Sequence, residues 1–184
     1  TMPVDVPILD VAGLVIAPGF IDSHTHDDGY LLVNRDMTPK VSQGITTVVT
    51  GNCGISLAPL VRNEIPQPLD LLGPADLFRF ATFGAWIDAL RESPAAVNVV
   101  PLVGHTTLRV AVMADTGRAA NSLEVTKMQA LLTEALEAGA FGMSTGTFYP
   151  PAALAPTKEI IEVGLPIRKH GGLYATHLRD EADL

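Results

Sequence analysis

Short apolar runs alternate with longer stretches of helical periodicity along this 184-residue chain. The runs are rich in apolar and β-branched residues, and each is four to eight residues long. Uninterrupted apolar strands are typical of a parallel sheet that is covered on both faces. The pattern therefore predicts five strands, at Leu14–Ile21, Thr46–Thr50, Val97–Val103, Ala140–Ser144 and Leu173–Thr176.

Apolar residues recur at helical spacing between these runs. One helix is predicted over 80–91. A second begins after Asn121, which can cap it together with Glu124, and ends at Gly139. A third is predicted over 157–170, bent or broken by Pro166 because proline removes a hydrogen bond from the helix.

Alternation of strand and helix predicts an α/β fold with a parallel sheet, either a closed eight-stranded barrel or an open doubly wound sheet. No glycine-rich phosphate-binding motif follows a strand. Glycines just past the strand ends favour the barrel, about five βα units of it; they are Gly51, Gly54, Gly104 and Gly146. The aperiodic segment 56–77 is interpreted as an insertion, serving either as a lid over the barrel mouth or as a surface connection.

Composition narrows the range of partners. The net charge of −8 argues against nucleic acid or an anionic membrane, because few cations are present to neutralise phosphates. A single cysteine, Cys53, allows no intrachain disulfide and favours a reducing compartment. We find no apolar run of roughly 20 residues and no signal-peptide pattern. The chain is therefore expected to be soluble and cytoplasmic.

Metal-ligand residue types stand at the ends of several predicted strands. His24 and His26 end the first strand. Because residues two apart on a strand point the same way, both imidazole rings face the same side. Cys53 follows the second strand, His105 the third and His177 the fifth. Each alone is weak evidence, since a lone cysteine is usually a buried apolar residue. Together they converge at one rim if the sheet closes, which favours a zinc site.

Several segments carry a family resemblance. PGFIDSHTH resembles the opening signature of the amidohydrolase superfamily. TTVVTGNCG, GHTTLR, STGTFYPPA and YATHLRDE, in this order, resemble its N-acyl-D-amino-acid deacylase (D-aminoacylase) branch. The likeness runs from Ile8 to the C-terminus.

The resemblance implies a partial (β/α)8 barrel and zinc-dependent hydrolysis of N-acyl-D-amino acids to a carboxylate and a D-amino acid. It implies that Cys53 and His177 hold a tight zinc ion, and that His24 and His26 line a second, weaker position. By the same likeness, Tyr149 polarises the scissile carbonyl and His105 lies near the substrate. A zinc-bound histidine after the sixth strand and a general-base aspartate after the eighth strand belong to the family pattern.

Those last two residues have no counterpart in the chain, so it resembles a fragment: residues 1–14 as a remnant of a small β-domain and 15–184 as the first five βα units. We expect the fragment alone to be inactive, and its open sheet edges to favour self-association or a completing chain. Two alternatives stay open. One is a cyclic amidohydrolase, which the lack of a lysine near the fourth strand disfavours; the other is a non-catalytic zinc-binding remnant.

Overall fold

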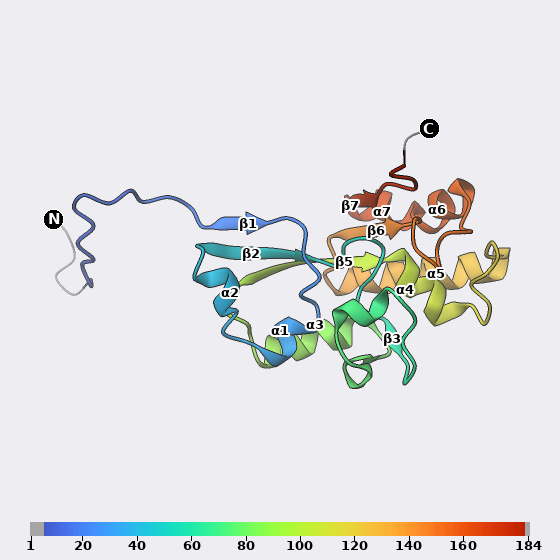
Figure 1. The fold of residues 1–184 in the computed structure, drawn as a ribbon, viewed down its shortest axis with the longest axis horizontal. Helices are drawn as coiled ribbons and strands as arrows, with labels where there is room; N and C mark the ends of the chain where they lie inside the picture. Colours follow the sequence, from blue (N-terminus) through green and yellow to red (C-terminus); the bar gives the residue numbers. More distant parts are fainter. Residues whose placement is uncertain (1–5, 183–184) are drawn as a thin grey trace.

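The central sheet of the computed structural model has five parallel strands whose spatial order follows the chain (Figure 1). They are β1 (Phe20–Asp22), β2 (Ile45–Thr50), β5 (Asn98–Gly104), β6 (Gly142–Gly146) and β7 (Leu173–His177). A doubly wound sheet would reverse its strand order at a switch point, whereas this order continues in one direction. The sheet is a curled half-barrel, which confirms the predicted fold class.

The structure describes residues 6–182. Residues 1–5, the start of the predicted β-domain remnant, and residues 183–184 lie outside the described residues. No helix in the described part is both long and apolar enough to span a bilayer.

Helices cover the outer side of the sheet, and the largest is α5 (Ser122–Ala138). Asn121 Oδ1 accepts from the Glu124 N–H, and the Glu124 carboxylate accepts from the Asn121 N–H, which is a complete capping box. Gly139 ends the helix with φ 119°, in the left-handed region that favours glycine. The predicted helix and both of its end signals are confirmed.

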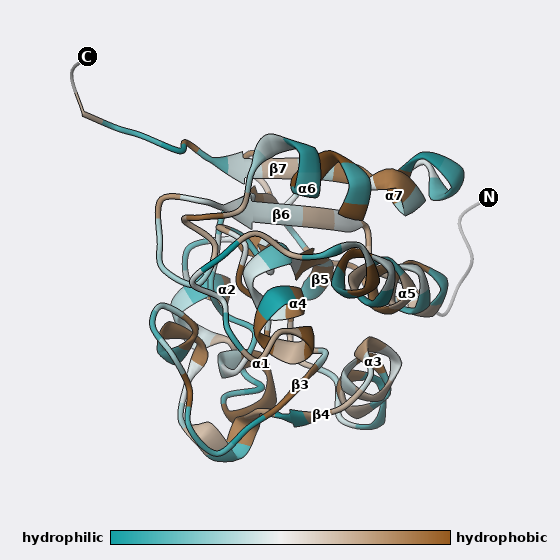
Figure 2. Cartoon of the chain, turned by 90° about the vertical axis from the view of Figure 1, so that its right-hand side faces the viewer, coloured by the Kyte–Doolittle hydropathy of each residue, from teal (hydrophilic) through white to brown (hydrophobic). Residues whose placement is uncertain are grey.

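Two other predicted helices differ from the structure at their ends. α3 (Phe83–Glu92) begins three residues later than expected, because Thr82 caps it by accepting from the Ala85 N–H at 3.1 Å. The predicted helix 157–170 is two helices, α6 (Thr157–Val163) and α7 (Leu165–His170). The break falls at Gly164, and Pro166 sits in the first turn of α7, where its missing N–H costs nothing. α3 and α5 lie side by side (Figure 2).

The first strand is shorter than predicted. Only Phe20–Asp22 pairs with β2, and residues 14–19 form no strand. Pro18 cannot donate a hydrogen bond to a neighbouring strand, which interrupts the predicted run. Figure 1 shows the segment before β1 leading away from the body of the molecule, and Val15 in it is 94% exposed.

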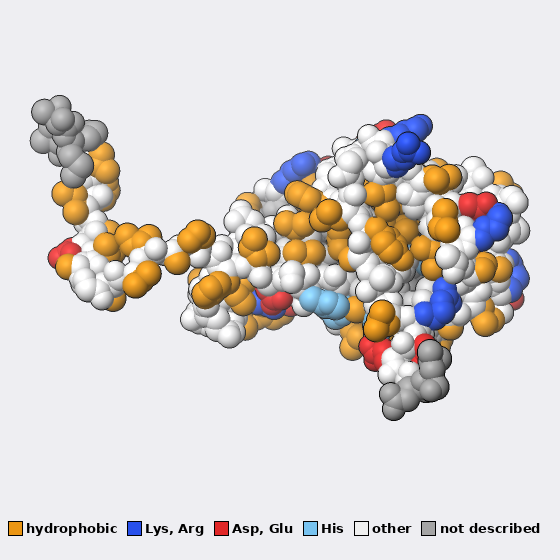
Figure 3. Space-filling view, turned by 90° about the horizontal axis from the view of Figure 1, so that it is seen from above, with side chains coloured by type: hydrophobic (Ala, Val, Ile, Leu, Met, Phe, Trp, Pro, Cys, Tyr) orange, Lys and Arg blue, Asp and Glu red, His pale blue; other side chains and the backbone are white. Residues whose placement is uncertain are grey.

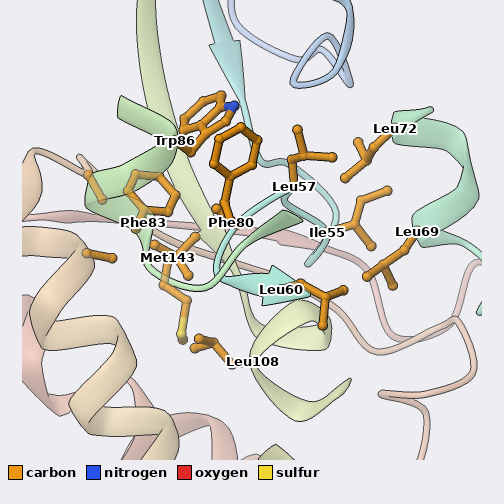
Figure 4. Packing of buried hydrophobic residues seen from close by; sticks show 14 of the residues in the cluster. Ile55, Leu57, Leu60, Leu69, Leu72, Phe80, Phe83, Trp86, Leu108 and Met143 are labelled. Carbon is orange, nitrogen blue, oxygen red and sulfur yellow. The ribbon is translucent and has the colours of Figure 1, made fainter. Parts of the chain in front are cut away.

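The insertion 56–77 packs into the core rather than lying as an aperiodic loop. It holds β3 (Leu60–Val61), which pairs antiparallel with β4 (Arg79–Phe80), and the 3-10 turns Leu69–Leu72 and Ala75–Leu77. Phe80, predicted in a helix, is therefore a strand residue. The insertion's leucines face Trp86 and Phe83 of α3 across one apolar cluster (Figure 4).

Three short helices were not predicted: α1 (Tyr30–Val33), α2 (Thr38–Val41) and α4 (His105–Val112). Within the described residues, β1 and β7 each pair with a strand on one side only. The view in Figure 3 shows apolar side chains spread over one face and along the N-terminal segment, with histidine side chains near its lower edge. Exposed Phe20, Ile21 and Tyr174 belong to the two edge strands.

Candidate metal centre

Two histidines and the cysteine meet at the carboxyl ends of β1 and β2. Ligand atoms of His24, His26 and Cys53 all lie within 4.8 Å of one another. His24 Nε2 is 3.1 Å from Cys53 Sγ, and the two imidazole rings meet edge to face with centroids 5.6 Å apart. The structure thus brings together three of the four predicted metal ligands.

The histidine pair is fixed through the residue between its members. The Thr25 N–H and hydroxyl both donate to the Val49 carbonyl, at 3.0 and 2.9 Å, which ties this turn to β2. Thr25 is buried, while His24 is exposed and His26 is half-buried. Because residues two apart in an extended segment share a side, anchoring Thr25 leaves both imidazoles facing the Cys53 loop.

Cys53 stands in a tight turn immediately after β2. Its φ is 53°, in the left-handed region, and the glycines at 51 and 54 also have positive φ, of 72° and 76°. A non-glycine residue rarely adopts this conformation, and it persists where the surroundings enforce it. The turn directs the thiol toward His24.

The donor set fits a zinc-like ion. Two imidazole nitrogens and a thiolate are typical zinc ligands, and separations below 4.8 Å suit donors that share one ion. His26 Nδ1 is buried and has no hydrogen-bond partner among the described residues, so it has an unused lone pair or proton. Burial, and then the charge of His24, lowers the pKa of His26, which favours the neutral imidazole. Burial, and then the charge of Glu181, raises the pKa of the Cys53 thiol, an effect that a bound cation would oppose.

His177, the fourth predicted ligand, lies outside this group. It ends β7, where its Nε2 is 2.7 Å from the Tyr149 hydroxyl and its Nδ1 is 3.5 Å from the Glu181 carboxylate. The Phe148 ring stacks on its imidazole at 5.9 Å. His177 and Tyr149 therefore form a second polar pair, in which burial raises the pKa of Tyr149.

His105 is not at the site. It is the first residue of α4, fully buried, and its Nε2 lies 3.1 Å from Glu159 Oε1. The same carboxylate accepts from Arg109, which also donates to the Pro151 carbonyl at 2.8 Å. The predicted substrate-side role of His105 stays a prediction, and the observed contacts are those of a buried ion-pair network.

The carboxylates near the group are already engaged. Asp27 pairs with Lys40 at 3.1 Å. Asp28 is buried and accepts from the N–H groups of Gly51 and Leu57, at 3.2 and 3.3 Å. Burial raises its pKa to about 7. Ser144, which contacts the Cys53 turn from β6, was not among the predicted site residues, because its position in a buried strand gives no sign of this contact.

The fold and the ligand group define an α/β-barrel protein with a candidate transition-metal site at its strand ends. A model of the amidohydrolase family matches residues 8–176. The chain therefore belongs to the amidohydrolase family.

Its similarities lie in one branch of that family. The chain is 74% identical over 179 residues to N-acyl-D-aspartate deacylase of Alcaligenes xylosoxydans xylosoxydans, covering 97% of this chain and 36% of that protein. It is 64% identical to D-aminoacylase of known structure, with a TM-score of 0.88, covering 89% of this chain and 35% of the other. The chain thus spans about a third of the length of these relatives.

The solved relatives are metal proteins. A further study of D-aminoacylase concerns its binuclear metal centre, in which one metal activates and the second attenuates. N-acyl-D-glutamate deacylase from Bordetella bronchiseptica was solved with zinc and a phosphonate that mimics the tetrahedral intermediate. It is 43% identical, with a TM-score of 0.84, over 90% of this chain and 35% of its own.

Proposed function

We propose that this chain supplies the metal-binding rim of an enzyme that hydrolyses the amide bond of N-acyl-D-amino acids, releasing a carboxylate and a D-amino acid. The observation that carries the proposal is the group of His24, His26 and Cys53 at the ends of adjacent parallel strands. Similarity to three deacylases of N-acyl-D-amino acids supports the substrate class.

The proposed ligands of zinc are His24, His26, Cys53 and His177. The first three already form a group, and His177 belongs to the neighbouring rim at the end of β7. Zinc bound there would polarise the amide carbonyl as a Lewis acid and lower the pKa of a water ligand to roughly 7.

Tyr149 is proposed to donate a hydrogen bond to the carbonyl oxygen of the substrate. Its hydroxyl already contacts His177, so it stands beside a proposed ligand at the same rim. A donor aimed at an oxygen that gains negative charge during amide hydrolysis stabilises the transition state more than the ground state.

Hydrolysis also needs a carboxylate that takes a proton from water. We assign this role to none of the nearby acidic residues. Asp27 is held by Lys40, and Asp28 is buried with its oxygens bound to backbone N–H groups.

The metal site is tested by zinc titration of the purified chain and its Cys53→Ala variant. We expect zinc affinity to fall at least tenfold in the variant, because the thiolate is the strongest donor of the set. His170→Ala is the matched control, since this exposed histidine at the end of α7 has its recorded side-chain hydrogen bond with the Pro166 carbonyl, away from the metal-ligand group. Unchanged zinc uptake by Cys53→Ala would refute the site.

The activity is tested on the natural protein that carries this sequence. N-acetyl-D-aspartate and N-acetyl-D-methionine are compared with their L-enantiomers, with release of the free amino acid as the readout. Turnover restricted to D-substrates supports the proposal. Equal turnover of both enantiomers, or none by the zinc-loaded protein, would contradict it.

A further inference from the structure

A single buried hydroxyl holds both ends of the turn that carries Cys53. Ser144 lies in β6 and is fully buried. Its Oγ donates to the Gly51 carbonyl and accepts from the Gly54 N–H at 2.9 Å. The hydroxyl therefore uses its one proton on Gly51 and a lone pair on Gly54, which flank Cys53 and lie 93 and 90 residues earlier in the chain.

This turn needs such support. Cys53 has φ 53°, in the left-handed region that is unfavourable for a residue with a side chain. The flanking glycines are flexible, so without fixed contacts the turn has other conformations available. Ser144 closes a bridge from Gly51 to Gly54, which fixes the direction in which the Cys53 side chain leaves the backbone.

The turn also lies directly on the ends of β5 and β6. A Cβ at Gly146 would come within 2.0 Å of the Cys53 carbonyl oxygen, and one at Gly104 within 2.3 Å of the Gly54 oxygen. The turn therefore packs directly against the strand ends, and the Ser144 hydroxyl reaches a partner on each side of Cys53.

The Ile55 N–H closes the turn itself by donating to the Asn52 carbonyl at 3.0 Å, and other groups hold the turn on one side each. The Thr106 N–H donates to the Gly54 carbonyl at 2.8 Å, and Asp28 accepts from the Gly51 N–H at 3.2 Å. Among the described residues, Ser144 is the side chain whose recorded hydrogen bonds reach both Gly51 and Gly54. Its loss is therefore expected to loosen the turn around Cys53 specifically.

We infer that Ser144 is a positioning residue for the metal-binding thiol: its hydroxyl sets the orientation in which Cys53 faces His24, and thereby the affinity of the site for zinc. The inference rests on the proposed function, in which Cys53 is a ligand. Residues that orient a ligand typically change metal affinity ten- to a hundredfold when removed.

The test compares Ser144→Ala with Thr145→Val. Thr145 is the next residue of β6 and equally buried, but its hydroxyl bonds to Tyr174 and Thr176 instead of the Cys53 turn. Zinc affinity is measured by competition with a chelator. We expect a ten- to hundredfold loss for Ser144→Ala and less than a threefold change for Thr145→Val.

A second readout needs no metal. Cys53 is the single cysteine, so its alkylation rate in the metal-free protein reports the orientation and accessibility of the thiol. We expect this rate to change several-fold in Ser144→Ala, at a temperature well below its unfolding midpoint, and to stay near wild type in Thr145→Val. A merely structural role would lower the midpoint without changing either readout in the folded protein.

Ser144→Thr and Ser144→Val form a second pair in case Ser144→Ala does not fold, because they match in shape and differ in the hydroxyl. Tighter zinc binding by the threonine variant supports the inference, and equal binding overturns it. If wild type binds zinc and Ser144→Ala binds it equally well, the inference fails and the proposed function stands. If wild type binds no zinc, both fail.

Discussion

Replacing Glu159 by glutamine tests the buried ion-pair network behind the site. The Glu159 carboxylate is 3% exposed and accepts hydrogen bonds from His105, Arg109 and the Ala120 N–H. Glutamine has nearly the same shape but carries no charge. The fully buried Arg109 guanidinium would then lose its only ion-pair partner among the described residues.

The magnitude follows from the ionisation of Glu159. Burial raises its pKa, but the hydrogen bonds from His105, Ala120 and Arg109 outweigh burial and lower the pKa from 4.5 to about 2. A shift of this size corresponds to about 3 kcal/mol of stability in favour of the ionised form. This agrees with the roughly 3–5 kcal/mol lost when one member of a buried ion pair is removed.

The sign of the pH dependence follows from the lowered pKa. The unfolded chain takes up the proton near pH 4.5 and the folded chain only near pH 2. The contribution is therefore complete above pH 4.5 and is lost as the pH falls from 4.5 toward 2. Glu159→Gln lacks this contribution at every pH.

The assay is urea unfolding of wild type and Glu159→Gln between pH 7 and pH 3, followed by circular dichroism. Wild type should be more stable by about 3 kcal/mol at pH 7, and this advantage should shrink below pH 4.5. Glu162→Gln is the control, because Glu162 lies on the same helix and pairs with exposed Lys158 at the surface. A difference below about 1 kcal/mol at pH 7, or one that does not change with pH, would refute the reasoning.

Two further substitutions probe the elements around the site. Trp86→Ala should lower the free energy of unfolding by about 3–5 kcal/mol, because Trp86 is 1% exposed and packs edge to face on Phe83, and chemical denaturation measures the loss. A loss below about 1 kcal/mol would contradict its place in the core. Asn121→Ala should lower the free energy of unfolding by about 1 kcal/mol by removing the cap of α5. Thr126→Ala, at an exposed position of the same helix, is the control, and an equal effect of both would argue against capping.

Apolar runs and end signals predicted the sheet and α5 well. β2, β5, β6 and β7 lie within two residues of their predicted ranges. β5 in particular carries the apolar pattern of a strand buried in a parallel sheet. The errors have local causes. Phe80 matches the helical spacing of α3 but belongs to β4, because a pairing with β3 some twenty residues earlier decides its conformation.

The candidate site was predictable only where its ligand residues directly follow a strand of the sheet. His24, His26 and Cys53 follow β1 and β2, so the sequence was enough to expect them together. His105 also follows a strand, but it opens α4 and turns into the helix layer toward Glu159. Spacing along the chain does not reveal this, because the partner lies 54 residues away.

The residues that fix the rim are buried polar groups on elements that carry no proposed ligand. Arg109 of α4 donates to the Pro151 carbonyl, two residues beyond Tyr149, while its guanidinium is held by Glu159 of α6. Ser144 of β6 likewise supports the Cys53 turn through its hydrogen bonds with Gly51 and Gly54. Buried polar side chains are costly unless they are hydrogen-bonded, so their partners are specified as tightly as the apolar core. The geometry of the rim therefore depends on contacts between distant parts of the chain, and substitutions at these supporting positions should affect the site without touching a ligand.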